Sequence, residues 1–214
     1  MPLKYESTLF YTCFSLLLGA CSSSKLVDQY TNPDNADYRV NKVLVIGMTP
    51  DGGIQKQFEF SLAEALKKHK IKAVKSVDYF GEEIIVGNKT DKELELLKNE
   101  LVADGFDAVF FSRIIGRDSK VSLFQSYRNL VRTFEVYGEY SNKHPVAYGS
   151  ESYESNPIIY TETLLYCLCP QNESDLMWKA NIEIANTSNT EESIQDYVRV
   201  LLKSLKKNNL LPHK

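Results

Sequence analysis

The sequence predicts an α/β fold, an α+β sandwich in which a β-α-β-α-β unit precedes an antiparallel meander and a C-terminal helix around one mixed sheet. A continuous apolar run at residues 42–48 is followed at once by apolar residues at helical spacing, which is typical of a parallel sheet. Residues 160–184 contain alternating apolar and polar side chains, as antiparallel strands do. The last apolar stripe, over residues 194–205, indicates an amphipathic helix.

The first elements alternate between strand and helix. Residues 42–48 predict a strand buried on both faces, and residues 49–53 a turn. A helix is expected over residues 54–69, where Phe58 and Leu62 belong to its apolar stripe and lysines crowd the last turn. A second strand is expected over residues 72–77.

The second helix is predicted to begin at Thr90, which makes a capping-box pattern with Glu93, and to end at Gly105. Residues 107–116 follow as a β-rich segment with an apolar centre, which predicts a central strand. These elements complete the β-α-β-α-β unit.

Three alternating segments, residues 131–140, 160–169 and 176–184, predict the antiparallel meander, with a hairpin turn at residues 170–175. In the third, Trp178 is expected on one face with Leu176, Ala180, Ile182 and Ile184, buried between the sheet and a helix. The closing helix is defined by its apolar side chains, Ile194, Tyr197, Val198, Leu201, Leu202 and Leu205.

Leu18-Gly19-Ala20-Cys21 ends a short apolar run at residues 9–18 and has the form of a bacterial lipobox. The run is about half of the roughly 20 apolar residues that a spanning helix needs. We therefore expect a signal peptide over residues 1–20, cleavage between Ala20 and Cys21, and lipid on Cys21. The alternative is a buried helix or strand that happens to end in Gly-Ala-Cys.

The polar, turn-rich residues 21–41 predict a flexible tether between the lipidated Cys21 and a single domain over residues 42–211. The lipid bilayer is then the first expected partner, through the acylated cysteine. Because Ser22 is not the aspartate that retains lipoproteins at the inner membrane of enteric bacteria, the periplasmic side of the outer membrane is the expected destination.

The composition excludes several classes of function. The net charge of −3 argues against a nucleic-acid partner, which a basic face would recognise. The three histidines are scattered and no Cys-x-x-Cys spacing occurs, so neither a metal site nor a cofactor is predicted. Cys167 and Cys169 are expected as free, packed cysteines, because a bridge between residues two apart would close a tight ring.

The turn after the first strand is where an α/β protein binds phosphate. Gly47 and Gly52 have the outer spacing of a P-loop, but Gly53 stands where the essential lysine is required and Asp51 would repel phosphates. A plain strand-to-helix turn is favoured over a ligand site. Asp51, Gly52 and Gly53 are retained as candidate contacts.

Three further residues are candidate contacts for a partner or ligand. Glu162 lies among Tyr160, Leu164 and Tyr166 on one strand face, so we expect it to be partly buried and to fix an arginine or a loop rather than to catalyse. Tyr148 and Tyr153 belong to a polar-aromatic loop at residues 141–157, where tyrosine either packs at a sheet edge or contacts a partner.

The C-terminal third resembles a family of uncharacterised bacterial lipoproteins. The shared pattern is a Glu-Thr strand (residues 160–166), a Leu-x-Trp strand beginning at Leu176, and a closing helix ending in Asn209-Leu-Leu. Family members carry an aspartate after the first strand, where this chain has Cys167 and Cys169. The order of elements over residues 42–207 also resembles the domain of Tol-system and curli-secretion lipoproteins. Neither resemblance implies a catalytic residue.

No serine-hydrolase, zinc-protease or dinucleotide motif is present in the chain. We therefore expect a membrane-anchored envelope lipoprotein that acts as a non-enzymatic interaction or assembly domain for an envelope protein partner. The alternative is a small-ligand-binding or enzymatic domain that uses the turn after the first strand. A turn closed by its own side chains would favour the first, and convergent free donors the second.

Overall fold

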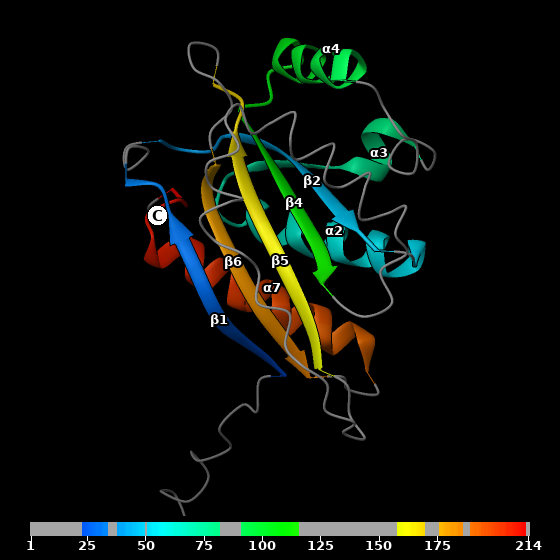
Figure 1. The fold of residues 1–214 in the computed structure, drawn as a ribbon, viewed down its shortest axis with the longest axis vertical. Coiled ribbons are helices and arrows are strands. Elements are labelled where there is room, and N and C mark those ends of the chain that lie inside the picture. Colours follow the sequence, from blue (N-terminus) through cyan, green and yellow to red (C-terminus); the bar gives the residue numbers. More distant parts are fainter. Residues whose placement is uncertain are drawn as a thin grey trace, which may run out of the picture.

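The computed structural model describes residues 23–33, 38–49, 51–81, 91–115, 158–169, 176–185 and 189–212. Two strands come first, helices are then interspersed with strands as far as β4, and β4, β5 and β6 follow one another before the last helix (Figure 1). The elements are β1 (Ser24–Thr31), β2 (Lys42–Met48), α2 (Gly52–Lys67), β3 (Lys72–Lys75), α3 (Ser76–Phe80), α4 (Asp91–Ala103), β4 (Ala108–Ile115), β5 (Ile158–Cys167), β6 (Leu176–Ala185) and α7 (Thr190–Lys207).

One six-stranded sheet has the order β1-β6-β5-β4-β2-β3. β2 pairs in parallel with β3 on one side and with β4 on the other. From β4 the sheet continues through β5, β6 and β1 with antiparallel pairing only. This mixed sheet confirms the predicted fold class, in which parallel strands precede an antiparallel meander and a final helix.

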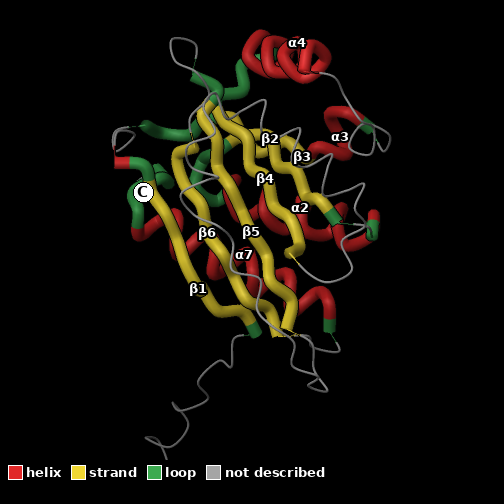
Figure 2. The backbone as a smooth tube through the Cα atoms, viewed as in Figure 1, coloured by secondary structure: helices red, strands yellow, loops and turns green. Residues whose placement is uncertain are grey.

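The helices α2 and α7 cover one face of the sheet (Figure 2). Leu62 and Leu66 of α2, together with Leu201 and Leu205 of α7, are fully buried there. Trp178 is also fully buried in this cluster, which confirms its predicted position between the sheet and a helix. Emptying such an aromatic site typically costs about 3–5 kcal/mol.

The opposite face is covered at one end by α3 and α4. Leu101 and the neighbouring Phe106 pack there against Phe111 of β4 and Tyr166 of β5. The helix α4 ends as predicted, because Gly105 has a positive φ of 77° and its N–H donates to Val102 O. Glycine adopts this conformation without steric cost. Thr90 lies outside the described residues.

The second strand is shorter than predicted. β3 ends at Lys75, and residues 76–80 form the helix α3 instead of continuing to Val77. Ser76, which is fully buried, donates its hydroxyl to Glu59 at 2.6 Å. A tertiary hydrogen bond to α2 therefore begins α3 where the local pattern predicts strand.

The tether expected over residues 21–41 is wrong for Ser24–Thr31, which form the edge strand β1 and pair with β6. Gln29, expected in a flexible segment, accepts hydrogen bonds from Ser204 Oγ of α7 at 2.5 Å and from Nδ2 of Asn208, the C-cap of α7, at 3.2 Å. A register shift between Leu26 and Asp28 interrupts the strand period. Polar inward residues and this bulge together hide the strand in the sequence.

The face assignment of Leu176 is also wrong. A register shift opposite Leu165 and Tyr166 places Met177 beside Trp178 in the core under α2 and α7. Leu176 packs on the other face, with the cluster that includes Leu101 and Phe106. Strict alternation cannot reveal such a bulge. The predicted strand at residues 131–140 and the turn at 170–175 lie outside the described residues.

Candidate functional site

The turn between β2 and α2 is closed by Asp51, which precedes the first residue of the helix. Its carboxylate accepts hydrogen bonds from the N–H groups of Gly53 at 2.8 Å and Ile54 at 3.1 Å. Open helix N-termini bind anions through these same N–H groups. Asp51 is therefore a helix cap, and Gly52 and Gly53 are exposed residues of the first helical turn.

A second carboxyl group, from Glu59, lies under this turn and is fully buried. It accepts hydrogen bonds from Gly47 N–H at 2.9 Å, Ser76 Oγ at 2.6 Å, Gln55 Nε2 at 3.0 Å and Val77 N–H at 3.2 Å. The group thus connects the end of β2, the helix α2 and the start of α3.

Glu59 occupies the place where open α/β sheets bind ligands, outside the carboxyl end of a strand next to a topological switch. Gly47 allows the close approach, because a Cβ there would lie 2.9 Å from Phe58 Cδ1. The carboxylate of Glu59 accepts the hydrogen bond from Gly47 N–H that a bound ligand would otherwise accept. Glu59 is not among the residues predicted as functional, although its position on the buried stripe between Gln55 and Leu62 was a usable signal.

Glu162 is the centre of an ion cluster on the other half of the sheet. Its Oε2 lies 2.9 Å from Arg113 Nε and 2.8 Å from Arg113 Nη2, and its Oε1 lies 2.8 Å from Lys179 Nζ. Arg113 of β4 is directly opposite Glu162 of β5, and Lys179 of β6 is diagonal to it. The side-chain period of two places all three on one face.

Burial by itself would raise the pKa of Glu162, but Arg113 and Lys179 outweigh it and hold that pKa below the usual range. The carboxylate is therefore ionised at neutral pH, whereas a general acid needs a raised pKa. Glu162, expected to be partly buried and to fix an arginine or a loop, is 4% exposed and pairs with Arg113 and Lys179. The arrangement stabilises charge across three strands.

On the other face of the sheet from the ion cluster, the face covered by α2 and α7, three hydroxyl groups meet. Tyr197 of α7 contacts Ser112 Oγ at 2.6 Å and also hydrogen bonds to Thr163 Oγ1. Ser112 and Thr163 are opposite each other on β4 and β5. Burial raises the pKa of Tyr197, so its phenol stays neutral. Sequence reasoning assigned Tyr197 to the apolar stripe and missed its polar end.

A fourth carboxylate, Asp196 of α7, holds the start of the described chain. It accepts hydrogen bonds from Ser23 N–H at 2.7 Å and Ser23 Oγ at 3.0 Å, and it pairs with Arg199. Burial by itself would raise the pKa of Asp196. The hydrogen bonds from Ser23 and the charge of Arg199 outweigh this effect, so the pKa of Asp196 lies below its ordinary value.

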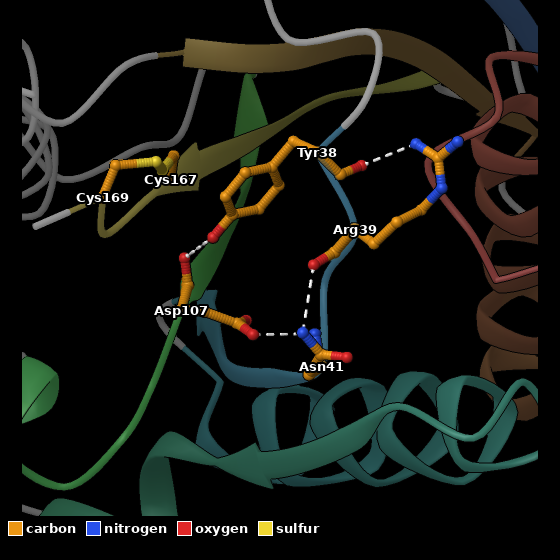
Figure 3. Close-up of a disulfide and its surroundings, with 6 residues drawn as sticks. All are labelled: Tyr38, Arg39, Asn41, Asp107, Cys167 and Cys169. Atoms are coloured by element: carbon orange, nitrogen blue, oxygen red, sulfur yellow. Dashed lines mark hydrogen bonds between the residues drawn. A yellow bond between two sulfur atoms is a disulfide. The ribbon is translucent and has the colours of Figure 1, made fainter. Parts of the chain in front are cut away.

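Cys167 and Cys169 form a disulfide at the end of β5, with their Cα atoms 5.3 Å apart (Figure 3). The expectation of two free cysteines is therefore wrong. This Cα separation lies in the normal range for a bridge. Beside it, Asp107 accepts from the N–H groups of Asn41 at 2.9 Å and Lys42 at 3.1 Å, and its carbonyl accepts from Tyr38 Oη.

The other candidate residues, Ala20, Cys21, Tyr148 and Tyr153, lie outside the described residues. Within the described ranges, no three or more histidine, cysteine, aspartate or glutamate side chains come together in a way that could hold a metal ion. In the same ranges, no helix combines the length and apolarity needed to cross a membrane.

No known protein family matches the sequence, and no curated protein sequence matches it. Solved structures similar to the chain include the PelC dodecamer from Paraburkholderia phytofirmans, at 13% identity and a TM-score of 0.45, covering 89% of this chain and 99% of that one. The lipoprotein GNA1162 from Neisseria meningitidis is similar at 13% identity and a TM-score of 0.37, with coverage of 79% and 97%.

Proposed function

We propose that the chain is a lipid-anchored protein of the bacterial cell envelope, and that its α/β domain is a non-enzymatic interaction or assembly domain for another envelope protein. The anchor is the acylated Cys21 after removal of residues 1–20. Its destination is the periplasmic side of the outer membrane, since Ser22 follows the cysteine.

The observation that supports a non-enzymatic role is the occupation of both candidate sites by the protein's own side chains. Asp51 caps the helix that would bind an anion, and Glu59 takes the N–H group of Gly47 beneath it. Glu162 forms ion pairs with both Arg113 and Lys179. These groups are committed to folding contacts, which favours binding through the surface over chemistry in a cleft.

The disulfide between Cys167 and Cys169 supports export from the cytoplasm. Disulfides persist in the periplasm and at cell surfaces, whereas cytosolic thiols are kept reduced. It is independent of the lipobox, because it lies in the folded domain and not in the signal sequence.

The anchor is tested by labelling the full chain with radioactive palmitate in a bacterium that processes lipoproteins. The Cys21→Ser protein should lose the label and the cleavage, and Cys13→Ser, which changes a cysteine inside the apolar run, should keep both. Label that persists in Cys21→Ser would contradict the proposed anchor.

The partner is tested by chemical crosslinking in intact cells, followed by purification of the full-length chain from membranes. We expect a discrete crosslinked envelope protein whose yield falls in Cys21→Ser, because the unanchored chain no longer concentrates at the membrane. Equal yield from both proteins, or crosslinks to no envelope protein, would contradict an assembly role at the membrane.

A further inference from the structure

We propose, on the premise that Cys21 carries the lipid, that the domain has no spacer and rests directly on the bilayer. The contact surface is the end of the sheet where β1 and β5 begin and β6 ends. Its occupant is the lipid surface itself. This deepens the proposed function by giving the domain a fixed face toward the membrane.

The covalent connection is too short for a spacer. Ser23 is two residues from Cys21, and consecutive Cα atoms are about 3.8 Å apart, so the two Cα atoms are separated by about 7.6 Å at most. The edge strand begins at Ser24. The acyl chains of Cys21 must enter the bilayer, which brings this end of the sheet to the headgroup region.

Ser23 is hydrogen-bonded to two different elements of the domain. Detaching β1 to lengthen the connection to Cys21 would therefore break these hydrogen bonds. Its backbone N–H and its hydroxyl donate to the buried carboxylate of Asp196 on α7, at 2.7 and 3.0 Å. Its carbonyl accepts from Ala185 N–H, at the end of β6, at 2.7 Å. The first described residue is thus held by both the sheet and the covering helix.

Exposed apolar side chains lie at the same end. Ile158 and Tyr160, at the start of β5, are 49% and 42% exposed. Ile158 is opposite Ala185, and the preceding Ile184 is opposite Ser24, so only β6 separates Ile158 from the start of β1. With neighbouring strands about 4.8 Å apart, Ile158 lies about 10 Å from that start.

Isoleucine and tyrosine suit an interface where an apolar surface meets headgroups. Charge at this end is mainly acidic, since Glu191 and Glu192, exposed in the first turn of α7, outnumber the exposed Lys25 at the start of β1. Anionic headgroups would be repelled, and so we infer a surface of zwitterionic lipid such as phosphatidylethanolamine.

The test places a tryptophan at each end of the molecule in the full-length, lipidated chain. Ile158→Trp probes the proposed contact, and Tyr160→Trp does so with a smaller change. Leu96→Trp is the matched control, because Leu96 is 60% exposed on α4, at the opposite end of the domain (Figure 1). Trp178 is fully buried and gives the same background in all variants.

Each protein is reconstituted into vesicles of phosphatidylethanolamine and phosphatidylcholine that contain chain-brominated lipid. We expect loss of emission and a blue shift at positions 158 and 160, and neither at position 96. A blue shift without quenching would assign the patch to a protein contact, such as a second copy, and would overturn the proposal. Equal quenching at all three positions would also overturn it.

A second variant tests the short connection. An insertion of about 20 Gly and Ser residues between Ser22 and Ser23 adds a spacer with a root-mean-square length of about 25 Å. Quenching at position 158 should fall to the level at position 96, and quenching that survives the insertion would overturn the role of the short link. Palmitate labelling of each protein separates the hypothesis of a lipid anchor on Cys21 from the hypothesis that the domain rests on the bilayer. Loss of the label contradicts the anchor, whereas loss of quenching at position 158 in a labelled protein without the insertion contradicts the orientation.

Discussion

Two buried carboxyl groups, Glu59 and Glu162, stabilise the two halves of the sheet by different means. Glu59, at the end of the parallel half, accepts hydrogen bonds from neutral donors in the described part of the chain: two backbone N–H groups, a serine and a glutamine. Glu162, in the antiparallel half, is paired with the charges of Arg113 and Lys179.

The partners of a buried acid depend on which donors its place in the sheet leaves available. At the switch between parallel strands, converging strand and helix ends supply N–H groups that lack partners in regular structure. In the middle of antiparallel strands those groups are already used by the ladder, so only side chains on neighbouring strands are left as partners. The first arrangement closes a crevice, and the second joins three strands.

Replacement of Glu162 should have the largest effect. Glu162→Gln leaves the buried Lys179 and the partly buried Arg113 without their shared carboxylate, and breaking a buried pair in this way costs about 3–5 kcal/mol. The free energy of unfolding from urea titration measures this loss. Glu183→Gln, a less buried glutamate on the same sheet face, is the control and should lose under about 1 kcal/mol. Equal losses would show that the ion cluster adds no special stability.

Acid should remove the advantage of Glu162. Its pKa is lower in the folded chain than the ordinary value of 4.5, so the unfolded chain binds more protons as the pH falls. The stabilisation is present in full above that value and disappears as the pH drops through the folded pKa. We expect the stability difference between wild type and Glu162→Gln to be constant near neutral pH and to shrink below about pH 4.5. A difference that grows on acidification would contradict the ionised cluster.

Replacement of Glu59 should have a smaller effect. Glu59→Gln keeps the shape but turns one acceptor into a donor, which leaves a buried N–H or hydroxyl unpaired at a cost of about 1–3 kcal/mol. Glu64→Gln, on an exposed part of the same helix, is the matched control and should be nearly neutral. A loss as large as that of Glu162→Gln would remove the distinction between the two halves.

Replacing Gly47 or Gly52 by alanine should have the smallest effects on stability, and the two positions should differ. Gly47→Ala places a methyl group 2.9 Å from Phe58 Cδ1 and pushes α2 away from β2, which should cost about 1–3 kcal/mol. Gly52→Ala enters open space at the first position of α2 and should be neutral or stabilising by up to about 1 kcal/mol. Thermal unfolding of both variants tests whether stability depends on the close approach of β2 to Phe58 of α2, and not on glycine as such.

Much of the fold could be predicted because its signals are local. The strand β2 has the predicted bounds, and α2, α4 and α7 lie where their apolar stripes predict them. The partial burial of Glu162 also followed from its strand neighbours. In each case the deciding pattern spans one element, and side-chain period reports which face is buried.

The edge strand β1 could not be predicted, because its inward polar residues find their partners far along the chain. Gln29 is bonded to Ser204 and Asn208, and Ser23 to Asp196, across 173 to 179 residues. Without α7 in place, this segment has the composition of a polar linker. The same holds for Glu59, whose partner Ser76 belongs to an element that the pattern assigned to a strand.

The sequence by itself determined the order of the periodic elements and the mixed character of the sheet, and the lipobox at residues 18–21 stays a prediction. Only the tertiary structure decided which donors each buried carboxyl group receives and where the domain begins. The physical reason is that periodicity records burial along one element, whereas hydrogen bonds and ion pairs depend on register between strands and on helices packed from distant parts of the chain.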